Sequence, residues 1–284
     1  MRLLLTLNSG KEKQLIPINY QYPLASAIYK ILQNADADYA EFLHEKGYGK
    51  GFKLFTFSDI KCPFKIDGDR LILLSNKIEL VVCFHLPKAA ETFIKGLFIS
   101  QQIDIADKKS KTHFTVEQVE SLVSPLDNIR SDGLRLTGIV EPLPSSLDPS
   151  DKNDEVEILL KPLSPVVCGL KNEKGNYDFL SPMDARYEEM LFKNWEEKCK
   201  AVFEKEEAEQ IMANGFIRVI FLKNPPKSRL VTIKANTEAE TKIRGFNNFN
   251  IQIKGKKEAV ELLLNSGVGL YNSQGMGCVE VIEP

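Results

Sequence analysis

The sequence has few of the residues that build metal sites and disulfide frameworks. It contains five cysteines and three histidines in 284 residues. The cysteines form no CxxC pair and have no zinc-ligand spacing with the histidines. We therefore expect buried free thiols and neither a bound metal nor a cofactor. The cysteines are Cys62, Cys83, Cys168, Cys199 and Cys278.

The sequence also lacks a long apolar run and an excess of charge. Its first seven residues are too short for a secretory signal, and no run is long enough to span a membrane. With 43% hydrophobic and 27% charged residues, it is typical of a soluble globular protein in the cytoplasm, with no membrane partner. Lys and Arg number 37 against 39 Asp and Glu, so any RNA site must be a local basic surface.

Hydrophobic periodicity and turn signals predict an α+β fold of two tandem ferredoxin-like domains with antiparallel sheets. We place the domains at 1–123 and 124–284, because Ser124 and Pro125 interrupt both periods. In the first domain we expect strands at 1–7, 53–58, 70–74, 77–84 and within 111–119, and helices at 22–35, 37–46 and 88–99. In the second we expect strands near 133–141, 156–162, 217–223, 230–234, 249–254 and 276–282, helices at 184–203 and 256–265, and an exposed loop at 142–155.

The most informative segment is the glycine loop, residues 267–277, in which two glycine pairs bracket five residues. It is no Walker loop, because Met276 and Gly277 follow Gly275 where Lys and Ser or Thr are required. It also fails the dinucleotide fingerprint, since Asn272 occupies the place of the third glycine. Glycine permits positive φ and close approach, so the loop predicts contact with a phosphate or a base edge. A glycine-rich hairpin or helix stop is the alternative.

Several motifs, in this order, resemble the CRISPR-associated endoribonucleases of the RAMP superfamily, which cut repeat RNA into guide RNAs. The resemblance spans nearly the whole chain. The motifs lie at 1–3, 20–29, 39–48, 52–58, 163–165 and in the glycine loop.

The resemblance implies a catalytic trio of Tyr29, His44 and Lys50. It also implies a metal-independent reaction in which the ribose 2′-hydroxyl attacks the adjacent phosphorus and leaves 2′,3′-cyclic phosphate and 5′-hydroxyl ends. Histidine suits either proton transfer, because its unperturbed pKa is about 6.5. We expect Lys50 to stabilise charge on the phosphate, and Tyr29 to carry a proton or orient the site.

Each residue of the trio also has a structural interpretation. His44 precedes Glu45-Lys46-Gly47 and fits the last turn of a helix, where an imidazolium complements the helix dipole. Tyr29 has helical spacing from Ala25 and fits a core, while Lys50 between two glycines fits a solvated loop.

The resemblance implies that the glycine loop lies against the first domain and contacts the RNA through backbone amides. The loop has no lysine or arginine between its glycine pairs, so charge must come from its neighbours, and Tyr271 suits base stacking. A solvated helix face is the alternative for the lysines. The expected RNA-binding residues are Gly267, Gly269, Tyr271, Asn272, Gly275, Gly277, Lys254, Lys256, Lys257, Lys242 and Arg244.

The leading interpretation is therefore a nuclease whose partner is CRISPR repeat RNA, with no DNA partner. One alternative is a catalytically silent RNA-binding or scaffold subunit of a CRISPR ribonucleoprotein. Another is a tandem ferredoxin-like module that binds a small ligand or a protein. The sequence leaves open whether the chain joins a CRISPR effector complex or forms a homodimer.

Overall fold

The computed structural model describes residues 1–124, 126, 155–173, 175–235 and 237–282. The expected strand near 133–141 and most of the expected loop at 142–155 lie outside the described residues. None of the described helices is long and apolar enough to cross a membrane. All five cysteines are free, and four are buried; Cys62 is half-buried.

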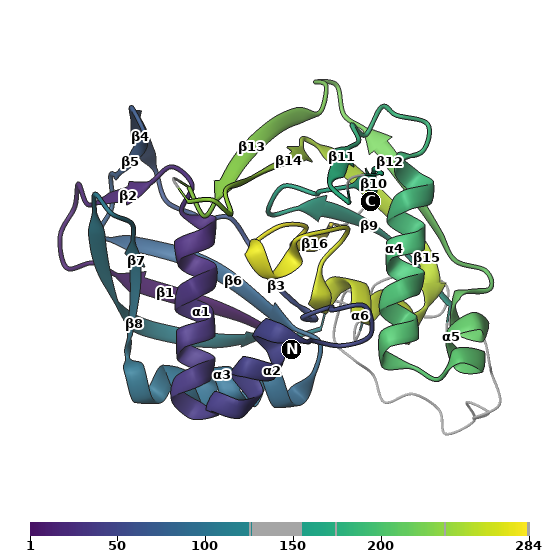
Figure 1. Ribbon diagram of the computed structural model, residues 1–284, viewed down its shortest axis with the longest axis horizontal. Coiled ribbons are helices and arrows are strands. Elements are labelled where there is room, and N and C mark those ends of the chain that lie inside the picture. Colours follow the sequence, from purple (N-terminus) through teal and green to yellow (C-terminus); the bar gives the residue numbers. More distant parts are fainter. Residues whose placement is uncertain (125, 127–154, 174, 236, 283–284) are drawn as a thin grey trace, which may run out of the picture.

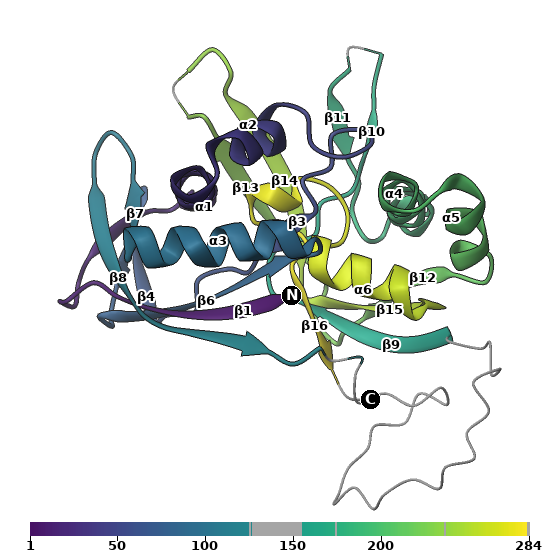
Figure 2. The ribbon, with the colours of Figure 1, turned by 90° about the horizontal axis from the view of Figure 1, so that it is seen from below.

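The first half of the chain forms a five-stranded antiparallel sheet in the order β3-β6-β1-β8-β7. Its helices lie on one face of this sheet, as Figure 2 shows. Strands β8-β1-β6-β3 have the fourth-first-third-second order of a ferredoxin-like unit, and β7 extends its edge. The elements are β1 (Arg2–Asn8), α1 (Gln21–Ala35), α2 (Ala37–Glu45), β3 (Phe55–Phe57), β6 (Lys77–Phe84), α3 (Pro87–Ser100), β7 (Gln102–Ala106) and β8 (Lys111–Leu122), with β2 (Leu15–Pro17), β4 (Phe64–Asp67) and β5 (Arg70–Leu73) in a small second sheet.

The second half repeats the plan, with a four-stranded sheet in the order β12-β15-β9-β16. The hairpin β13–β14 is inserted between its second and third strands, and the hairpin β10–β11 follows its first (Figure 1). The elements are β9 (Glu155–Pro162), β10 (Gly169–Lys171), β11 (Tyr177–Phe179), α4 (Tyr187–Val202), α5 (Lys205–Met212), β12 (Phe216–Phe221), β13 (Lys227–Ile233), β14 (Thr241–Asn247), β15 (Phe249–Lys256), α6 (Lys257–Ser266), the 3-10 turn η1 (Asn272–Gln274) and β16 (Val279–Ile282).

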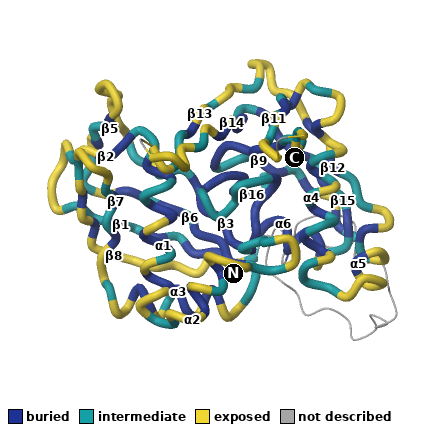
Figure 3. The backbone as a smooth tube through the Cα atoms, viewed as in Figure 1, coloured by how far each residue is buried: buried dark blue, intermediate teal, exposed yellow. Residues whose placement is uncertain are grey.

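These two strand orders confirm the fold class that the sequence predicts. The apolar stripe on α4 is also confirmed, because Tyr187, Leu191, Trp195 and Cys199 are all buried. Figure 3 shows exposed residues concentrated at loop tips and on the outer sides of the helices. The division of the chain between residues 123 and 124 remains a prediction.

One predicted strand, 53–58, was too long. The strand β3 contains only Phe55–Phe57, and Leu54 before it has a φ of +53°. This left-handed residue turns the chain, so Lys53 leaves the line of the strand. Alternation of apolar side chains carries no information about such a turn.

Polar contacts also join the two halves of the molecule. Arg2 is buried and donates to the backbone oxygens of Leu264 and Val279, at 3.3 and 2.7 Å. Arg229 on β13 donates through Nη1 to both carboxylate oxygens of Asp59, which follows β3, at 2.8 and 2.9 Å. These contacts hold α6, β16 and the hairpin β13–β14 against the first half of the chain.

Candidate active site

Tyr29 and His44 meet where α1 and α2 pack together. Their ring centroids are 5.4 Å apart, with the rings nearly perpendicular. Tyr29 also packs edge-on against Phe55 of β3, which fixes its ring from the other side. His44 lies in the last turn of α2, with its side chain 67% exposed, and its Nδ1 is 2.9 Å from Oε1 of Glu45. The structure thus brings two of the three predicted residues together.

Burial keeps the Tyr29 phenol neutral. Loss of solvent raises the pKa of Tyr29 to about 12, and a hydrogen bond with the Ser273 side chain partly opposes this rise. The phenol therefore remains protonated at neutral pH and can donate a hydrogen bond. Ser273 belongs to the glycine loop, so the environment of Tyr29 comes from both halves of the chain.

Lys50, the third predicted residue, lies in a loop that packs on α4. Its Nζ is 2.6 Å from Oε2 of Glu197, and its side chain is 74% exposed. A Cβ at the preceding Gly49 would lie 2.6 Å from the Cβ of Ala201. The structure therefore ties Lys50 to the second half of the chain by an ion pair with Glu197, whereas Tyr29 and His44 contact each other.

Lys53 is the cation next to His44, and the sequence reasoning missed it. Its Nζ donates to the backbone oxygen of His44 at 2.9 Å. Burial lowers its pKa, while the charge of Glu45 raises it. Lys53, Tyr271 and Ser273 also line a cavity of about 170 Å³ between the two halves. The only sign of Lys53 in the sequence was its position two residues after Gly51, the second of the glycines that flank Lys50.

The glycines of the glycine loop are buried, and they permit close packing. A Cβ at Gly275 would lie 2.3 Å from the Phe57 ring, and one at Gly277 would lie 1.9 Å from the backbone oxygen of Val268. The amide of Gly275 donates to Asn272, and that of Gly277 donates to Pro165. These amides are thus engaged inside the protein. Tyr271 and Ser273 are among the half-buried side chains of the loop that line the small cavity.

Two polar side chains hold the glycine loop from within. Lys198 on α4 is 1% exposed, and burial lowers its pKa to about 7. Its Nζ donates to the backbone oxygens of Gly267 and Gly269 and to Oδ1 of Asn272. The Asn272 amide in turn donates to the backbone oxygens of Val268 and Met276. The Asn272 side chain is therefore bonded within the protein, and no sequence pattern predicted its partner Lys198.

The predicted basic neighbours do not form one surface beside the glycine loop. Lys254, Lys256 and Lys257 lie at the N-terminal end of α6, whereas the loop follows its C-terminal end, about 15 Å away for ten residues. Lys254 pairs with Glu155 at 3.4 Å. The other two, Lys242 and Arg244, lie on β14 of the inserted hairpin.

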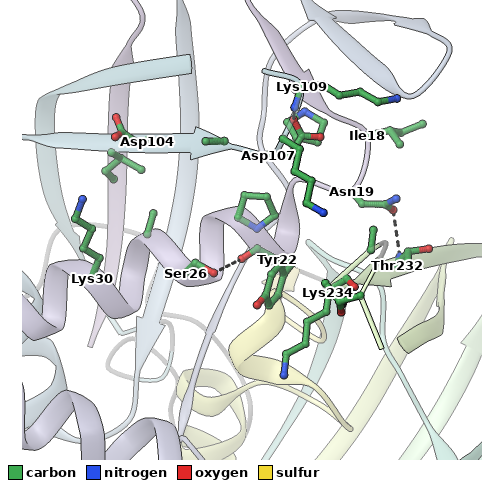
Figure 4. Close-up of a pocket in the computed structure, with 18 of the residues that line it drawn as sticks. Ile18, Asn19, Tyr22, Ser26, Lys30, Asp104, Asp107, Lys109, Thr232 and Lys234 are labelled. Atoms are coloured by element: carbon green, nitrogen blue, oxygen red, sulfur yellow. Dashed lines mark hydrogen bonds between the residues drawn. The ribbon is translucent and has the colours of Figure 1, made fainter. Parts of the chain in front are cut away.

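A larger groove lies along α1. It has a volume of about 1110 Å³ and is enclosed by α1, β7 and the end of β13 (Figure 4). Tyr22, Ser26 and Lys30 line it at helical spacing, and Lys234 projects from the opposite side. Because Tyr29 is seven residues after Tyr22, it lies on the same face of α1, about 10 Å further along.

The groove carries positive charge that no aspartate balances. Its three aspartates, Asp69, Asp104 and Asp107, pair with Lys109, Lys111 and Arg70 respectively. Three more lysines of the lining form no ion pair with a described residue: Lys30, Lys108 and Lys234. Among all residues that the structure describes, no group of three or more His, Cys, Asp or Glu side chains is arranged to hold a metal ion.

We expect Gly275→Ala to destabilise the protein more than Gly175→Ala. The two glycines have φ angles of +77° and +78°, so both substitutions strain the backbone alike, but only Gly275 faces a ring; nothing lies within 4 Å of a Cβ at Gly175. Urea unfolding should show an additional loss of about 1–3 kcal/mol for Gly275→Ala. Equal losses would show that the loop does not depend on this close approach.

Comparison with known proteins places the chain in a family. The model of "CRISPR-associated protein Cas6, N-terminal" matches residues 15–120, and that of "CRISPR associated protein Cas6, C-terminal" matches residues 148–281. A curated relative, "CRISPR-associated endoribonuclease Cas6 1" of Methanocaldococcus jannaschii, is 26% identical over 273 residues. This match covers 94% of this chain and 88% of the relative.

Solved structures share the fold. One from Pyrococcus furiosus, described as the product of a Cas6-related gene, superposes with a TM-score of 0.69 at 19% identity, covering all of this chain and 98% of its own. Another, described as a RAMP protein binding different RNA substrates, has a TM-score of 0.68 at 19% identity and full coverage of both chains. The two family models together match most of the chain in the expected order, and the chain therefore belongs to the Cas6 family of CRISPR-associated proteins.

Proposed function

We propose that this protein is an endoribonuclease that cuts CRISPR repeat RNA in precursor transcripts, without a metal ion. The observation that carries the proposal is the contact between Tyr29 and His44, with Lys53 beside them, in a member of this family. The sequence predicted an endoribonuclease, and the relative from Methanocaldococcus jannaschii is also named an endoribonuclease.

The reaction is an internal transesterification at one phosphate. The ribose 2′-oxygen attacks phosphorus, the bond from phosphorus to O5′ breaks, and the products are a 2′,3′-cyclic phosphate and a 5′-hydroxyl. His44 takes the 2′ proton, because its imidazole is exposed at the site and histidine is the side chain that most often serves as a general base. O5′ needs a proton as it leaves. Lys53 supplies it, since its pKa is lowered and it lies beside His44.

Tyr29 acts as a neutral hydrogen-bond donor in this proposal. A phenol with a pKa of about 12 is a poor base at neutral pH, so the 2′ proton does not go to Tyr29. It donates to a phosphoryl oxygen, where charge builds up during the attack. Lys50 contributes positive charge at the rim, once RNA competes with Glu197 for it.

The RNA strand follows α1 from the groove to the site. Tyr22 offers a ring for base stacking, and the lysines of the groove neutralise phosphates. Tyr271 and Ser273 contact the strand at the cut. Of the RNA-binding residues predicted from the sequence, Tyr271 keeps that proposed role. The buried glycines and Asn272 act by shaping the loop.

We expect His44→Ala to abolish most cleavage of repeat RNA in excess chelator. Removing a proton-transfer group typically slows a reaction by ~10²–10⁴. Product ends should carry a 2′,3′-cyclic phosphate in the wild type, as mass spectrometry can show. The control is His113→Ala, because His113 is a second exposed histidine, bonded to Asp104 on β7, with no role in the proposed proton transfers. Cleavage that stops in chelator and returns with added magnesium would contradict the proposal.

The rate ratio of wild type to Tyr29→Phe should be constant between about pH 6 and pH 9. A phenol with a raised pKa stays protonated below that pKa, so its donor is present across this whole window and is lost only near pH 12. Single-turnover cleavage at each pH gives the ratio. A ratio that grew about tenfold per pH unit would instead identify Tyr29 as the base.

Removing lysines from the groove and removing lysines near α6 should affect the salt dependence of RNA binding differently. The triple variant Lys30→Ala, Lys108→Ala, Lys234→Ala should flatten the slope of log K against log salt by about 2, as expected for three single-strand phosphate contacts. The matched variant Lys254→Ala, Lys256→Ala, Lys257→Ala should leave the slope near that of the wild type. Filter binding of repeat RNA decides between them, and the reverse pattern would move the RNA to the end of α6.

Association with a CRISPR effector complex and formation of a homodimer remain predictions. So does the absence of a DNA partner.

A further inference from the structure

A buried lysine lines the same small cavity as Lys53, Tyr271 and Ser273. Lys198 is 1% exposed, although lysine is almost never fully buried unless it is paired. Its Nζ is 2.5 Å from the oxygen of Gly267, 2.8 Å from Oδ1 of Asn272 and 3.3 Å from the oxygen of Gly269. An ammonium group has three protons, and three acceptors surround it.

Asn272 carries this restraint across the loop. Its Oδ1 accepts from Lys198, and its Nδ2 donates to the backbone oxygens of Val268 and Met276, at 3.1 and 3.0 Å. Those two oxygens lie on the entering and leaving arms of the loop. Met276 is also held from the first half of the chain, because Thr56 of β3 donates to the same oxygen at 2.9 Å. One side chain thus ties both arms of the loop to α4.

The restraint ends next to Tyr29. Asn272 begins the turn η1, and the next residue, Ser273, hydrogen-bonds the Tyr29 phenol. The turn lies against α1 and β3, as its position in Figure 1 shows. Gly275 at its end packs on the Phe57 ring. A shift of Asn272 would therefore move Ser273 relative to the phenol.

We propose that Lys198 is a positioning residue for the reaction, acting through Asn272 and Ser273 to aim the Tyr29 hydroxyl. The inference rests on the proposed function for its effect on rate, but its structural part does not depend on it. Burying an amine is costly unless hydrogen bonds replace its water. An apolar residue would fill this place in a helix stripe at lower cost, so stability alone does not explain the lysine.

The test compares Lys198→Met and Asn272→Ala with Lys193→Met, a control at an exposed lysine of the same helix. Single-turnover cleavage at saturating repeat RNA measures the chemical step, and RNA affinity is measured separately. The signal of ¹³Cζ-labelled Tyr29, assigned with Tyr29→Phe, reports its hydrogen bond without RNA. Ser273→Ala gives the signal position of a phenol without that bond.

We expect Lys198→Met to lower the rate of the chemical step by about 10²-fold, as small misplacements of a catalytic group do. Its affinity for RNA should stay within about threefold of the wild type. The Tyr29 signal of Lys198→Met should move to the position seen in Ser273→Ala. The double variant that combines Lys198→Met with Asn272→Ala should cleave no more slowly than the slower of the two single variants. Asn272→Ala should show the same loss of rate and the same shift of the Tyr29 signal. If Lys198→Met does not fold, Asn272→Ala alone tests the inference. The signal of Lys193→Met should stay at the wild-type position.

An unmoved Tyr29 signal in both Lys198→Met and Asn272→Ala would overturn the inference, as would wild-type cleavage by either. Independent, multiplying rate losses in the double variant would also overturn it. If the wild-type protein fails to cleave repeat RNA, the proposed function fails, while the ¹³C signals still decide whether Lys198 positions Tyr29.

Discussion

The candidate site depends on one steric constraint, the contact between the glycine loop and β3. At Gly275 a single added carbon would overlap the Phe57 ring, and at Gly277 it would overlap the chain itself. Only glycine allows this approach at positive φ. The contact brings Ser273, from the end of the chain, to Tyr29, near its beginning. The proposed chemistry therefore uses groups from two similar folds, neither of which contains the whole site.

The same constraint explains how a nearly neutral protein can serve as an RNA enzyme. The loop uses the amides of Gly275 and Gly277 and the side chain of Asn272 for its own structure, and it contains no lysine or arginine. Phosphate charge must then be met elsewhere. The unbalanced lysines of the groove along α1 meet that need without changing the net charge of −2. Electrostatic affinity and chemistry thus come from side chains of the same helix, since Lys30 lines the groove and Tyr29 lies at the candidate site.

The sequence predicted those features that rest on local pattern. Strand and helix periodicity predicted the repeated ferredoxin-like order, and the motifs around Tyr29 and His44 predicted the family, which the comparisons confirm. Features that rest on tertiary contacts were missed. Lys53 was assigned to a strand because nothing in the sequence showed the left-handed turn at Leu54. Lys198 lies among charged residues of a helix, and its burial follows only from how α4 packs.

The reason for the glycines was the hardest part to predict. Four glycines indicate close approach, but the sequence does not say whether the approaching group is a phosphate or the protein itself. The structure gives the second answer for Gly275 and Gly277. The predicted basic residues next to the glycine loop were also misplaced, because nearness in sequence is not nearness in space. Lys254 and the glycine loop lie at opposite ends of α6.

In the proposed reaction the cut phosphate lies between Tyr29, His44 and Lys53, beside the glycine loop. The decisive measurement is a crystal structure with repeat RNA that carries a 2′-deoxy nucleotide at the cut position, so that the nucleophile is absent. We expect the phosphate within hydrogen-bond reach of the Tyr29 hydroxyl and Lys53, with the 2′ carbon facing His44 and the upstream strand along the groove of α1. A cut phosphate bound elsewhere, with His44 in contact with solvent alone, would contradict it.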